Sequence, residues 1–379
     1  MPATIWKKRD KEERIMEKMI GIIAANYSNS RMEGLTDNRS IASLPFGAQY
    51  RMIDFALSNF VNSGITSVGT IIPAQSRSLL DHISFGKNWR LDRKAGGLFF
   101  LPESGYRKDR SKINYILHDL SKNKEFLLRS MAKYVAYSCT HMVYNIDYDK
   151  IADYMKETGA DLCLIGAKNF RNYEYCLKLS TDRSGRIKSI TKNPQENDFS
   201  FVASFVMRRE LLLSLVEACD VTDNRTFLDI VIGNLKNWDV RLYEHTGYVG
   251  HIGSVSDYYR CSLDLLKETV HREQFFSDRH IMTKIHDNVP TRYYKTAKVK
   301  NSLINSNGNI FGTVENSIVF RNVYISEGAV VRNSIILPGG RVGQNAVVEN
   351  AIVDKKCVVN DGSIVRGTET NPYVLRKDK

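Results

Sequence analysis

The chain has 379 residues, of which 42% are apolar and 25% are charged, so it can bury a large core and is neither disordered nor fibrous. Its six cysteines lack the paired spacing of a zinc site, and no apolar run reaches the roughly 18 residues of a membrane span. Together these features predict a soluble, cytoplasmic protein without a signal peptide or a disulfide framework.

A net charge of +12 can indicate a nucleic-acid partner, but the basic residues are spread along the whole chain. We therefore expect an anionic small molecule, with no nucleic acid and no membrane as partner. One local group of cations lies beside Trp89 and suits a phosphate, although a solvated basic face explains it equally well. The group consists of Arg77, His82, Lys87, Arg90, Arg93 and Lys94.

Strand and helix patterns alternate through the first 275 residues. Apolar runs predict strands over residues 19–25, 67–72, 134–138 and 161–167, and helical spacing predicts helices over 51–62, 122–132 and 149–158. This order indicates a Rossmann-like α/β domain whose mostly parallel sheet has helices on both faces. A turn at residues 182–185 between the runs 175–180 and 187–191 predicts a hairpin, so we expect a mixed sheet.

After residue 310 the pattern changes to a repeat of six residues, which is typical of a parallel β-helix. Its core positions are Ile318, Tyr324, Val330, Ile336, Val342 and Val348, and its corners are Asn322, Gly328, Asn333, Gly339, Asn345 and Asn350. The open end of such a stack indicates oligomerisation or docking onto the first domain. We predict a solvated extension over residues 1–18, an α/β domain over 19–275, a linker over 276–297 and the β-helix over 298–379.

The loop after the first predicted strand lacks the glycines expected there. In α/β nucleotide-binding domains this loop lets backbone N–H groups close on a phosphate, which requires residues without a Cβ. Here the loop reads Asn26-Tyr27-Ser28-Asn29-Ser30-Arg31. The chain thus looks like a nucleotide-handling scaffold from which the chemical centre has been removed.

Residues 35–39, 45–59 and 62–65 closely resemble the N-terminal region of bacterial glucose-1-phosphate adenylyltransferase, also called ADP-glucose pyrophosphorylase. Further similar residues are His141, 147–148, 159–161, 250–254, Tyr258 and 316–318. The resemblance covers about residues 19–365 and implies a GT-A-like nucleotidyltransferase domain followed by a left-handed parallel β-helix. Members of that family convert ATP and glucose 1-phosphate into ADP-glucose and pyrophosphate during glycogen synthesis.

Seven positions depart from the family's pattern, and they are Asn26, Tyr27, Asn29, Ile41, Thr140, Asn193 and His251. The first three replace phosphate-loop glycines, and Ile41 replaces a lysine that pairs with the nucleotide phosphates. Thr140 and His251 replace two Mg²⁺-binding carboxylates, and the sugar-phosphate lysine is displaced from Asn193 to Lys192. Because Mg²⁺ requires anionic oxygen ligands, we expect no metal or cofactor in this chain, and Mg²⁺ belongs to a catalytic partner.

The resemblance therefore implies a regulatory subunit, inactive alone, that joins a catalytic glucose-1-phosphate adenylyltransferase subunit in a homo- or hetero-tetramer. Two alternatives stay open. One is an active sugar-1-phosphate nucleotidyltransferase whose metal ligands are rearranged to Asp147, Asp149 or Asp257, and the other is a stand-alone sugar-phosphate sensor. The candidates for binding a ligand or phosphorylated effector are Arg31, Arg77, His82, Lys87, Arg90, Arg93 and Lys192. For the five candidates from Arg77 to Arg93, contact with the catalytic partner is the alternative expectation.

Overall fold

A computed structural model describes residues 18–32, 34–105, 116–168, 177–192, 198–219 and 225–376. Residues 1–17 of the predicted extension, and Asn193, lie outside the described residues. The chain forms two compact units. Unit 1 comprises Met1–Tyr27, Ala56–Ala74 and Ser84–Val249, and unit 2 comprises Ser28–Phe55, Gln75–Ile83 and Gly250–Lys379. The bounds of the four segments proposed from the sequence remain predictions.

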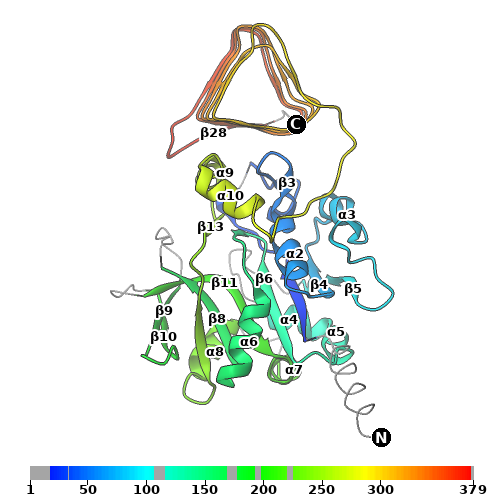
Figure 1. Ribbon diagram of the computed structural model, residues 1–379, viewed down its shortest axis with the longest axis vertical. Helices are drawn as coiled ribbons and strands as arrows, with labels where there is room; N and C mark the ends of the chain where they lie inside the picture. Colours follow the sequence, from blue (N-terminus) through cyan, green and yellow to red (C-terminus); the bar gives the residue numbers. More distant parts are fainter. Residues whose placement is uncertain are drawn as a thin grey trace, which may run out of the picture. The chain divides into compact units, whose positions relative to one another are not determined.

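A mixed sheet forms the centre of unit 1 (Figure 1). Its strands among the described residues are β1 (Met19–Ala24), β4 (Ser67–Ile72), β5 (Gly97–Pro102), β6 (Tyr134–Cys139), β8 (Leu162–Ala167), β9 (Lys178–Thr181), β10 (Ile187–Thr191), β11 (Phe199–Arg208) and β12 (Val240–Glu244). The main path runs β10-β9-β11-β6-β1-β4-β5, and β8 pairs with both β11 and β12. Strand β1 is parallel to β4 and β6, whereas β11 is antiparallel to β6, β8 and β9, which confirms the predicted mixed sheet.

Helices pack on both faces of this sheet. They are α2 (Met52–Asn62), α4 (Ile116–Lys122), α5 (Glu125–Leu128), α6 (Tyr148–Thr158), α7 (Arg209–Glu217) and α8 (Phe227–Gly233). Because strand side chains alternate between faces, Ile20 and Ile22 of β1 join the apolar core formed with α4, α7 and α8. Gly21 faces the opposite side, where a Cβ would lie 2.5 Å from the Phe60 ring of α2. The sheet approaches α2 this closely only because Gly21 has no side chain.

The helix predicted over residues 122–132 is wrong in its bounds. Helix α4 ends at Lys122, and the short α5 begins at Glu125 and ends at Leu128. Between them the Asn123 side chain donates to the carbonyl oxygens of Asp119 (2.7 Å) and Pro102 (2.9 Å). An asparagine amide that bonds the backbone in this way competes with continued helix, so the apolar spacing alone misplaced the element.

The β-helix of unit 2 is built from three parallel sheets, and Figure 1 shows its triangular cross-section. The first sheet contains β14 (Arg292–Tyr293), β17 (Asn309–Ile310), β20 (Tyr324–Ile325), β23 (Arg341–Val342) and β26 (Val358–Val359). The second contains β15 (Lys298–Lys300), β18 (Thr313–Glu315), β21 (Val330–Arg332), β24 (Val347–Glu349) and β27 (Ile364–Arg366). The third contains β16 (Leu303–Ile304), β19 (Ile318–Val319), β22 (Ile335–Ile336), β25 (Ala351–Val353) and β28 (Tyr373–Leu375). This arrangement fits the predicted left-handed parallel β-helix.

The predicted corners of the β-helix are confirmed, whereas the predicted core track is only partly right. Asn322, Asn333, Asn345 and Asn350 have φ angles of 60°, 45°, 57° and 48°, the left-handed region that asparagine tolerates. In the later coils, residues that pair across neighbouring coils, such as Val331 and Val348, are 17 residues apart, so a strict repeat of six slips by one position per coil. Tyr324 is consequently 39% exposed.

The remaining elements of unit 2 are η1 (Ser30–Met32), η2 (Ile41–Ser43), β2 (Pro45–Phe46), β3 (Tyr50–Arg51), α3 (Arg77–Ile83), β13 (Gly250–His251), α9 (Val255–Asp264) and α10 (Glu268–Phe275). Several hydrogen bonds and ion pairs join this part of unit 2 to the β-helix, including one from Tyr259 and one from Arg39. The Tyr259 hydroxyl donates to the carbonyl oxygen of Asn333 (2.5 Å), and the Arg39 guanidinium pairs with Asp354 (2.5 Å). Across the described ranges, none of the helices combines the length and apolar character needed to cross a membrane.

Replacing Gly21 by alanine should destabilise unit 1, because the added Cβ would overlap the Phe60 ring. Overpacking of this kind costs about 1–3 kcal/mol, which a urea unfolding curve resolves. Gly233→Ala at the end of α8 is the matched control, since nothing lies within 4 Å of its new Cβ. Equal midpoints for Gly21→Ala and the unmodified chain would contradict the packing of β1 on α2.

Candidate functional site

The loop after β1 is filled by its own side chains. Asn26 is 4% exposed and Tyr27 is 7% exposed. The Tyr27 ring stacks on the His141 ring, with the centroids 3.8 Å apart and the planes inclined by 28°. The contact joins the end of β1 to the residues directly after β6. An aromatic pair therefore lies where a phosphate-binding loop needs bare backbone.

A buried carboxylate fixes the first residue of this loop. The Asn26 side chain donates to Oδ2 of Asp119 (2.8 Å), and the backbone N–H of Ser104 donates to Oδ1 of the same residue (2.7 Å). Asp119 lies on the buried side of α4. Asp119 was not predicted as a site residue. An acid within the mostly apolar run Ile116-Leu117-His118-Asp119-Leu120 does indicate a buried carboxylate that needs hydrogen-bond partners.

Neutral groups occupy the first of the two expected metal-ligand positions. Thr140 is buried, and its hydroxyl donates to the carbonyl oxygen of Ala24 (3.2 Å). The neighbouring Cys139 thiol is also buried, which raises its pKa to about 12 and keeps it protonated at neutral pH. Neither side chain offers the anionic oxygen that a divalent cation requires.

The second expected metal-ligand position lies in unit 2 and is also neutral. Burial lowers the pKa of His251 to about 4, with further lowering from Arg260 and Arg31 and a partial offset from Asp257. The Asp257 carboxylate pairs with Arg260 at 2.7 Å and lies 4.0 Å from Nδ1 of His251. Ile41, at the position of the family's phosphate-pairing lysine, is a buried core residue of unit 2.

The residues present do not fit Mg²⁺. Within the described ranges, no three His, Cys, Asp or Glu side chains are grouped in a way that would hold a metal ion. Each carboxylate considered as a substitute ligand has a local role instead. Asp147 caps α6 by accepting the backbone N–H of Asp149 (3.1 Å), Asp149 pairs with Lys18 (2.8 Å), and Asp257 pairs with Arg260.

Unit 2 contains a second candidate site, in which burial and neighbouring basic side chains lower the pKa values of Arg51, His286 and Lys355. It consists of the cations Arg39, Arg51, Lys284, Arg321 and Lys355 with the imidazole of His286, and we call it the cationic cluster. Burial, Arg51 and Arg39 lower the pKa of Lys355 to about 8, and burial lowers the pKa of Arg321. Positive charges that destabilise one another in this way favour binding of an anion.

The arginines of the cationic cluster are held by hydrogen bonds that fix their positions. Arg39 pairs with Asp354 and donates from Nε to the carbonyl oxygen of Leu35 (2.6 Å). Arg51 donates to the carbonyl oxygen (2.5 Å) and hydroxyl (3.0 Å) of Ser78 on α3. The sequence analysis missed this cluster, because its members lie far apart in the chain and share no local pattern.

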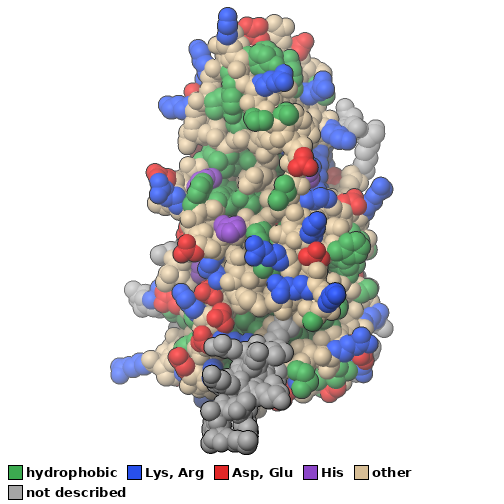
Figure 2. Space-filling view, turned by 45° about the vertical axis from the view of Figure 1, so that its right-hand side comes forward, with side chains coloured by type: hydrophobic (Ala, Val, Ile, Leu, Met, Phe, Trp, Pro, Cys, Tyr) green, Lys and Arg blue, Asp and Glu red, His purple; other side chains and the backbone are tan. Residues whose placement is uncertain are grey.

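The predicted effector candidates are distributed over both units. Arg31 and Arg77 are exposed residues of unit 2, whereas His82 of unit 2 is buried and bonds Asp54 through Nε2 (2.6 Å). Lys87, Arg90, Arg93 and Lys192 are exposed residues of unit 1. The face drawn in Figure 2 shows Lys and Arg side chains dispersed among acidic ones, in agreement with a spread of charge along the sequence.

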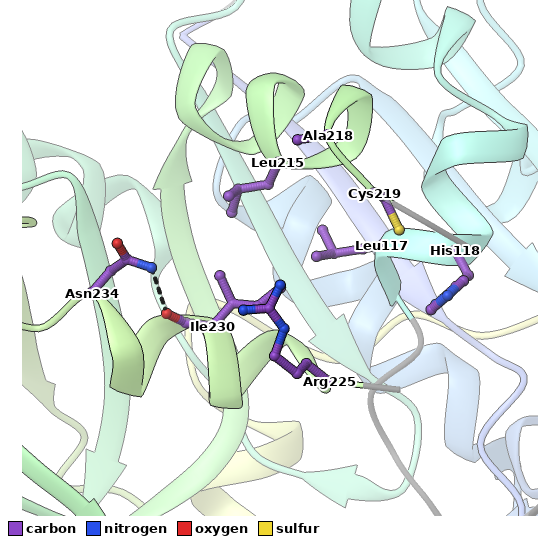
Figure 3. Close-up of a pocket in the computed structure, with 8 residues that line it drawn as sticks. All are labelled: Leu117, His118, Leu215, Ala218, Cys219, Arg225, Ile230 and Asn234. Atoms are coloured by element: carbon purple, nitrogen blue, oxygen red, sulfur yellow. Dashed lines mark hydrogen bonds between the residues drawn. The ribbon is translucent and has the colours of Figure 1, made fainter. Parts of the chain in front are cut away.

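Unit 1 also holds a cavity of about 190 Å³ beside α4, α7 and α8 (Figure 3). Its walls combine apolar side chains with a few polar ones, and it is lined by Leu117, His118, Leu215, Ala218, Cys219, Arg225, Ile230 and Asn234. The Asn234 amide donates to the carbonyl oxygen of Ile230 (2.9 Å), as the dashed line in Figure 3 marks. No carboxylate is among these lining residues.

Two models of known protein families match the chain and identify its fold. A family model described as nucleotidyl transferase matches residues 20–268, more than half of the chain. The chain belongs to the nucleotidyl transferase family. A second model, described as GlmU-like, C-terminal hexapeptide, matches residues 287–371, which include most strands of the β-helix. The predicted succession of a nucleotidyltransferase fold and a hexapeptide β-helix is thereby confirmed.

Curated relatives of this nucleotidyl transferase family member cover almost its full length. The chain is 35% identical over 365 residues to the glycogen biosynthesis protein GlgD of Geobacillus stearothermophilus, and the matched region covers 95% of this chain and 96% of that protein. It is 29% identical over 360 residues to GlgD of Bacillus subtilis, with the same coverage. It is also 29% identical over 358 residues to the glucose-1-phosphate adenylyltransferase of Bacillus cereus strain ZK / E33L, and this match covers 92% of the chain and 95% of that protein. These matches confirm the family resemblance seen in the sequence.

Acid should destabilise this nucleotidyl transferase family member through His251. Its pKa of about 4 lies below the ordinary 6.5, so the unfolded chain binds a proton that the folded chain does not bind between these values. Stability therefore rises with pH from about 4 to 6.5, by an amount on the order of 3 kcal/mol for this one group.

We expect His251→Gln to flatten the dependence of the unfolding midpoint on pH in that window. His280→Gln, which replaces an exposed histidine of unit 2, is the control and should follow the unmodified chain. Thermal unfolding recorded at several pH values measures both slopes. If the His251→Gln and His280→Gln curves coincide, the account of His251 is wrong.

Inorganic phosphate should raise the thermal midpoint of the chain more than chloride does at equal ionic strength, because a bound anion relieves repulsion in the cationic cluster. Arg321→Ala and Lys355→Ala should each remove most of this extra shift, as followed by scanning fluorimetry. Lys300→Ala on the exposed strand β15 should leave it unchanged. A phosphate shift of the same size in all of these variants would contradict an anion site at the cluster.

Proposed function

We propose that the chain is a non-catalytic, regulatory subunit of a hetero-oligomeric glucose-1-phosphate adenylyltransferase in glycogen biosynthesis. A catalytic subunit would supply the chemistry and Mg²⁺, and this chain would raise its activity or change its response to an effector. The relatives support the process of glycogen biosynthesis, since two are named glycogen biosynthesis protein GlgD and a third is named glucose-1-phosphate adenylyltransferase. The regulatory role is our inference from the site.

The stack of Tyr27 on His141 is the observation that carries this proposal. Nucleotidyl transfer needs a loop that admits a triphosphate and a cation that neutralises its charge. The loop is filled by Asn26 and Tyr27, and neutral Thr140 and His251 stand where carboxylates would bind the cation. Loss of several kcal/mol of transition-state stabilisation lowers a rate by a factor on the order of a thousand or more.

A subunit without chemistry can still regulate. It needs only to bind one conformer of the catalytic subunit more tightly than another, since differential affinity shifts the population between them. The cationic cluster supports a phosphorylated metabolite as the effector, because partly buried arginines such as Arg51 recognise phosphate oxygens well. Binding at the cluster would then alter the affinity of this chain for the catalytic subunit.

The same cluster also favours a second candidate function, a stand-alone sensor of a phosphorylated sugar. Such a sensor would bind the sugar phosphate through Arg51, Arg321 and Lys355 and would not change the rate of any adenylyltransferase. The experiment that tests the regulatory function also separates it from this sensor.

The purified chain should release no pyrophosphate above background from ATP, glucose 1-phosphate and Mg²⁺. Mixed with the intact glucose-1-phosphate adenylyltransferase of the same organism, it should change kcat, KM or the effector response severalfold. Arg321→Ala should preserve the complex and reduce the effector response, whereas Lys300→Ala should preserve both. Turnover by the chain alone would contradict the proposal, and ligand binding without any effect on the homologue would favour the sensor.

A further inference from the structure

Phe85 is the most exposed aromatic side chain among the described large hydrophobic residues of unit 1, with 79% of its surface accessible. It lies directly before η3 (Lys87–Trp89), in a loop whose backbone is unusual on both sides of it. Ser84 has a φ of 46° and Gly86 a φ of 76°, both in the left-handed region. Such backbone angles in a non-glycine residue such as Ser84 persist only where the surrounding structure enforces them.

The loop that carries Phe85 is fixed from within. Trp89 and Leu91 are buried, and the backbone N–H groups of both donate to the carbonyl oxygen of Gly86 (3.0 Å each). A Cβ at Gly86 would lie 2.8 Å from Cβ of Leu91, so the chain packs closely there. Arg93 closes the loop by donating from Nε to the carbonyl oxygen of Arg90 (2.7 Å). The Phe85 ring is therefore displayed by an ordered loop and is not the tip of a flexible one.

Basic side chains follow Phe85 in the same loop. Residues 84–97 carry four exposed basic residues and a single acid, Asp92, and the basic residues are Lys87, Arg90, Arg93 and Lys94. A large exposed hydrophobic side chain in a loop that also presents cations is a typical anchor for a protein partner. The partner surface that fits this chemistry is an apolar socket bordered by carboxylates.

We propose that Phe85 is the central contact of an interface with a different protein, whose facing surface is an apolar socket bordered by carboxylates. The inference rests on the proposed function, in which that protein is the catalytic adenylyltransferase subunit. Charge disfavours the same loop of a second copy of this chain as the occupant, because two identical loops would bring like charges together.

The test uses the full-length chain and the purified glucose-1-phosphate adenylyltransferase of the same organism, with the Kd measured by biolayer interferometry. Phe85→Ser should weaken the complex by about tenfold or more, as loss of a central anchor does. Arg90→Glu combined with Arg93→Glu should weaken it and remove its dependence on salt. Met131→Ser is the matched control, because Met131 is a 72% exposed apolar residue elsewhere in unit 1, and its Kd should stay within about twofold.

The outcomes separate this inference from the proposed function. If the unmodified chain forms the complex and Phe85→Ser changes its Kd by less than twofold, the inference alone is overturned. No complex with the unmodified chain overturns the inference and the proposed function together. Sedimentation of the chain alone completes the test, since a self-association that Phe85→Ser abolishes would assign the loop to a second copy and overturn the choice of partner. Matching circular dichroism melts show that the variants are folded.

Discussion

The stack of Tyr27 on His141 holds the end of β1 against the residues that follow β6, and the functional account depends on this contact. In a parallel sheet these two strand ends are where a nucleotide would be bound. Backbone N–H groups can enclose a phosphate only if no side chain occupies the space, and here a phenol and an imidazole occupy it. Asp119 strengthens the arrangement, because its carboxylate accepts hydrogen bonds from the Asn26 side chain and the Ser104 backbone.

The two expected metal positions carry neutral side chains, whereas several cations lie together in unit 2. Thr140 and His251 are neutral at physiological pH, so the expected metal positions have lost their attraction for a cation. In the cationic cluster of unit 2, burial together with Arg51 and Arg39 lowers the pKa of Lys355 to about 8, and Asp354 offsets this only in part. A bound anion would relieve the remaining repulsion between these positive charges.

Much of the fold could be predicted from the sequence, because it follows from local patterns. The Asn corners of the β-helix need a left-handed backbone, and Asn322 and Asn333 have it. The coil length of 17 residues could not be read from a repeat of six, so Tyr324 was placed in the core by mistake. The break between α4 and α5 was missed because it depends on hydrogen bonds of Asn123, which apolar spacing does not detect.

The candidate site was predicted in part. Departures at Asn26, Tyr27 and Thr140 were visible from the family pattern, but the pattern cannot show that Tyr27 stacks on His141. Asp119 and the cationic cluster were missed, since their partners are brought together only by the tertiary fold. Arg39 and Asp354, for example, are separated by most of the chain and form one ion pair.

Binding of Mg²⁺-ATP to the purified chain tests the central claim most directly, with the intact adenylyltransferase of the same organism titrated in parallel by calorimetry. The account predicts a Kd weaker than about 1 mM for this chain and no effect of Mg²⁺ on it. Stoichiometric binding in the micromolar range that requires Mg²⁺ would show that the filled loop opens to a nucleotide, and would contradict the account.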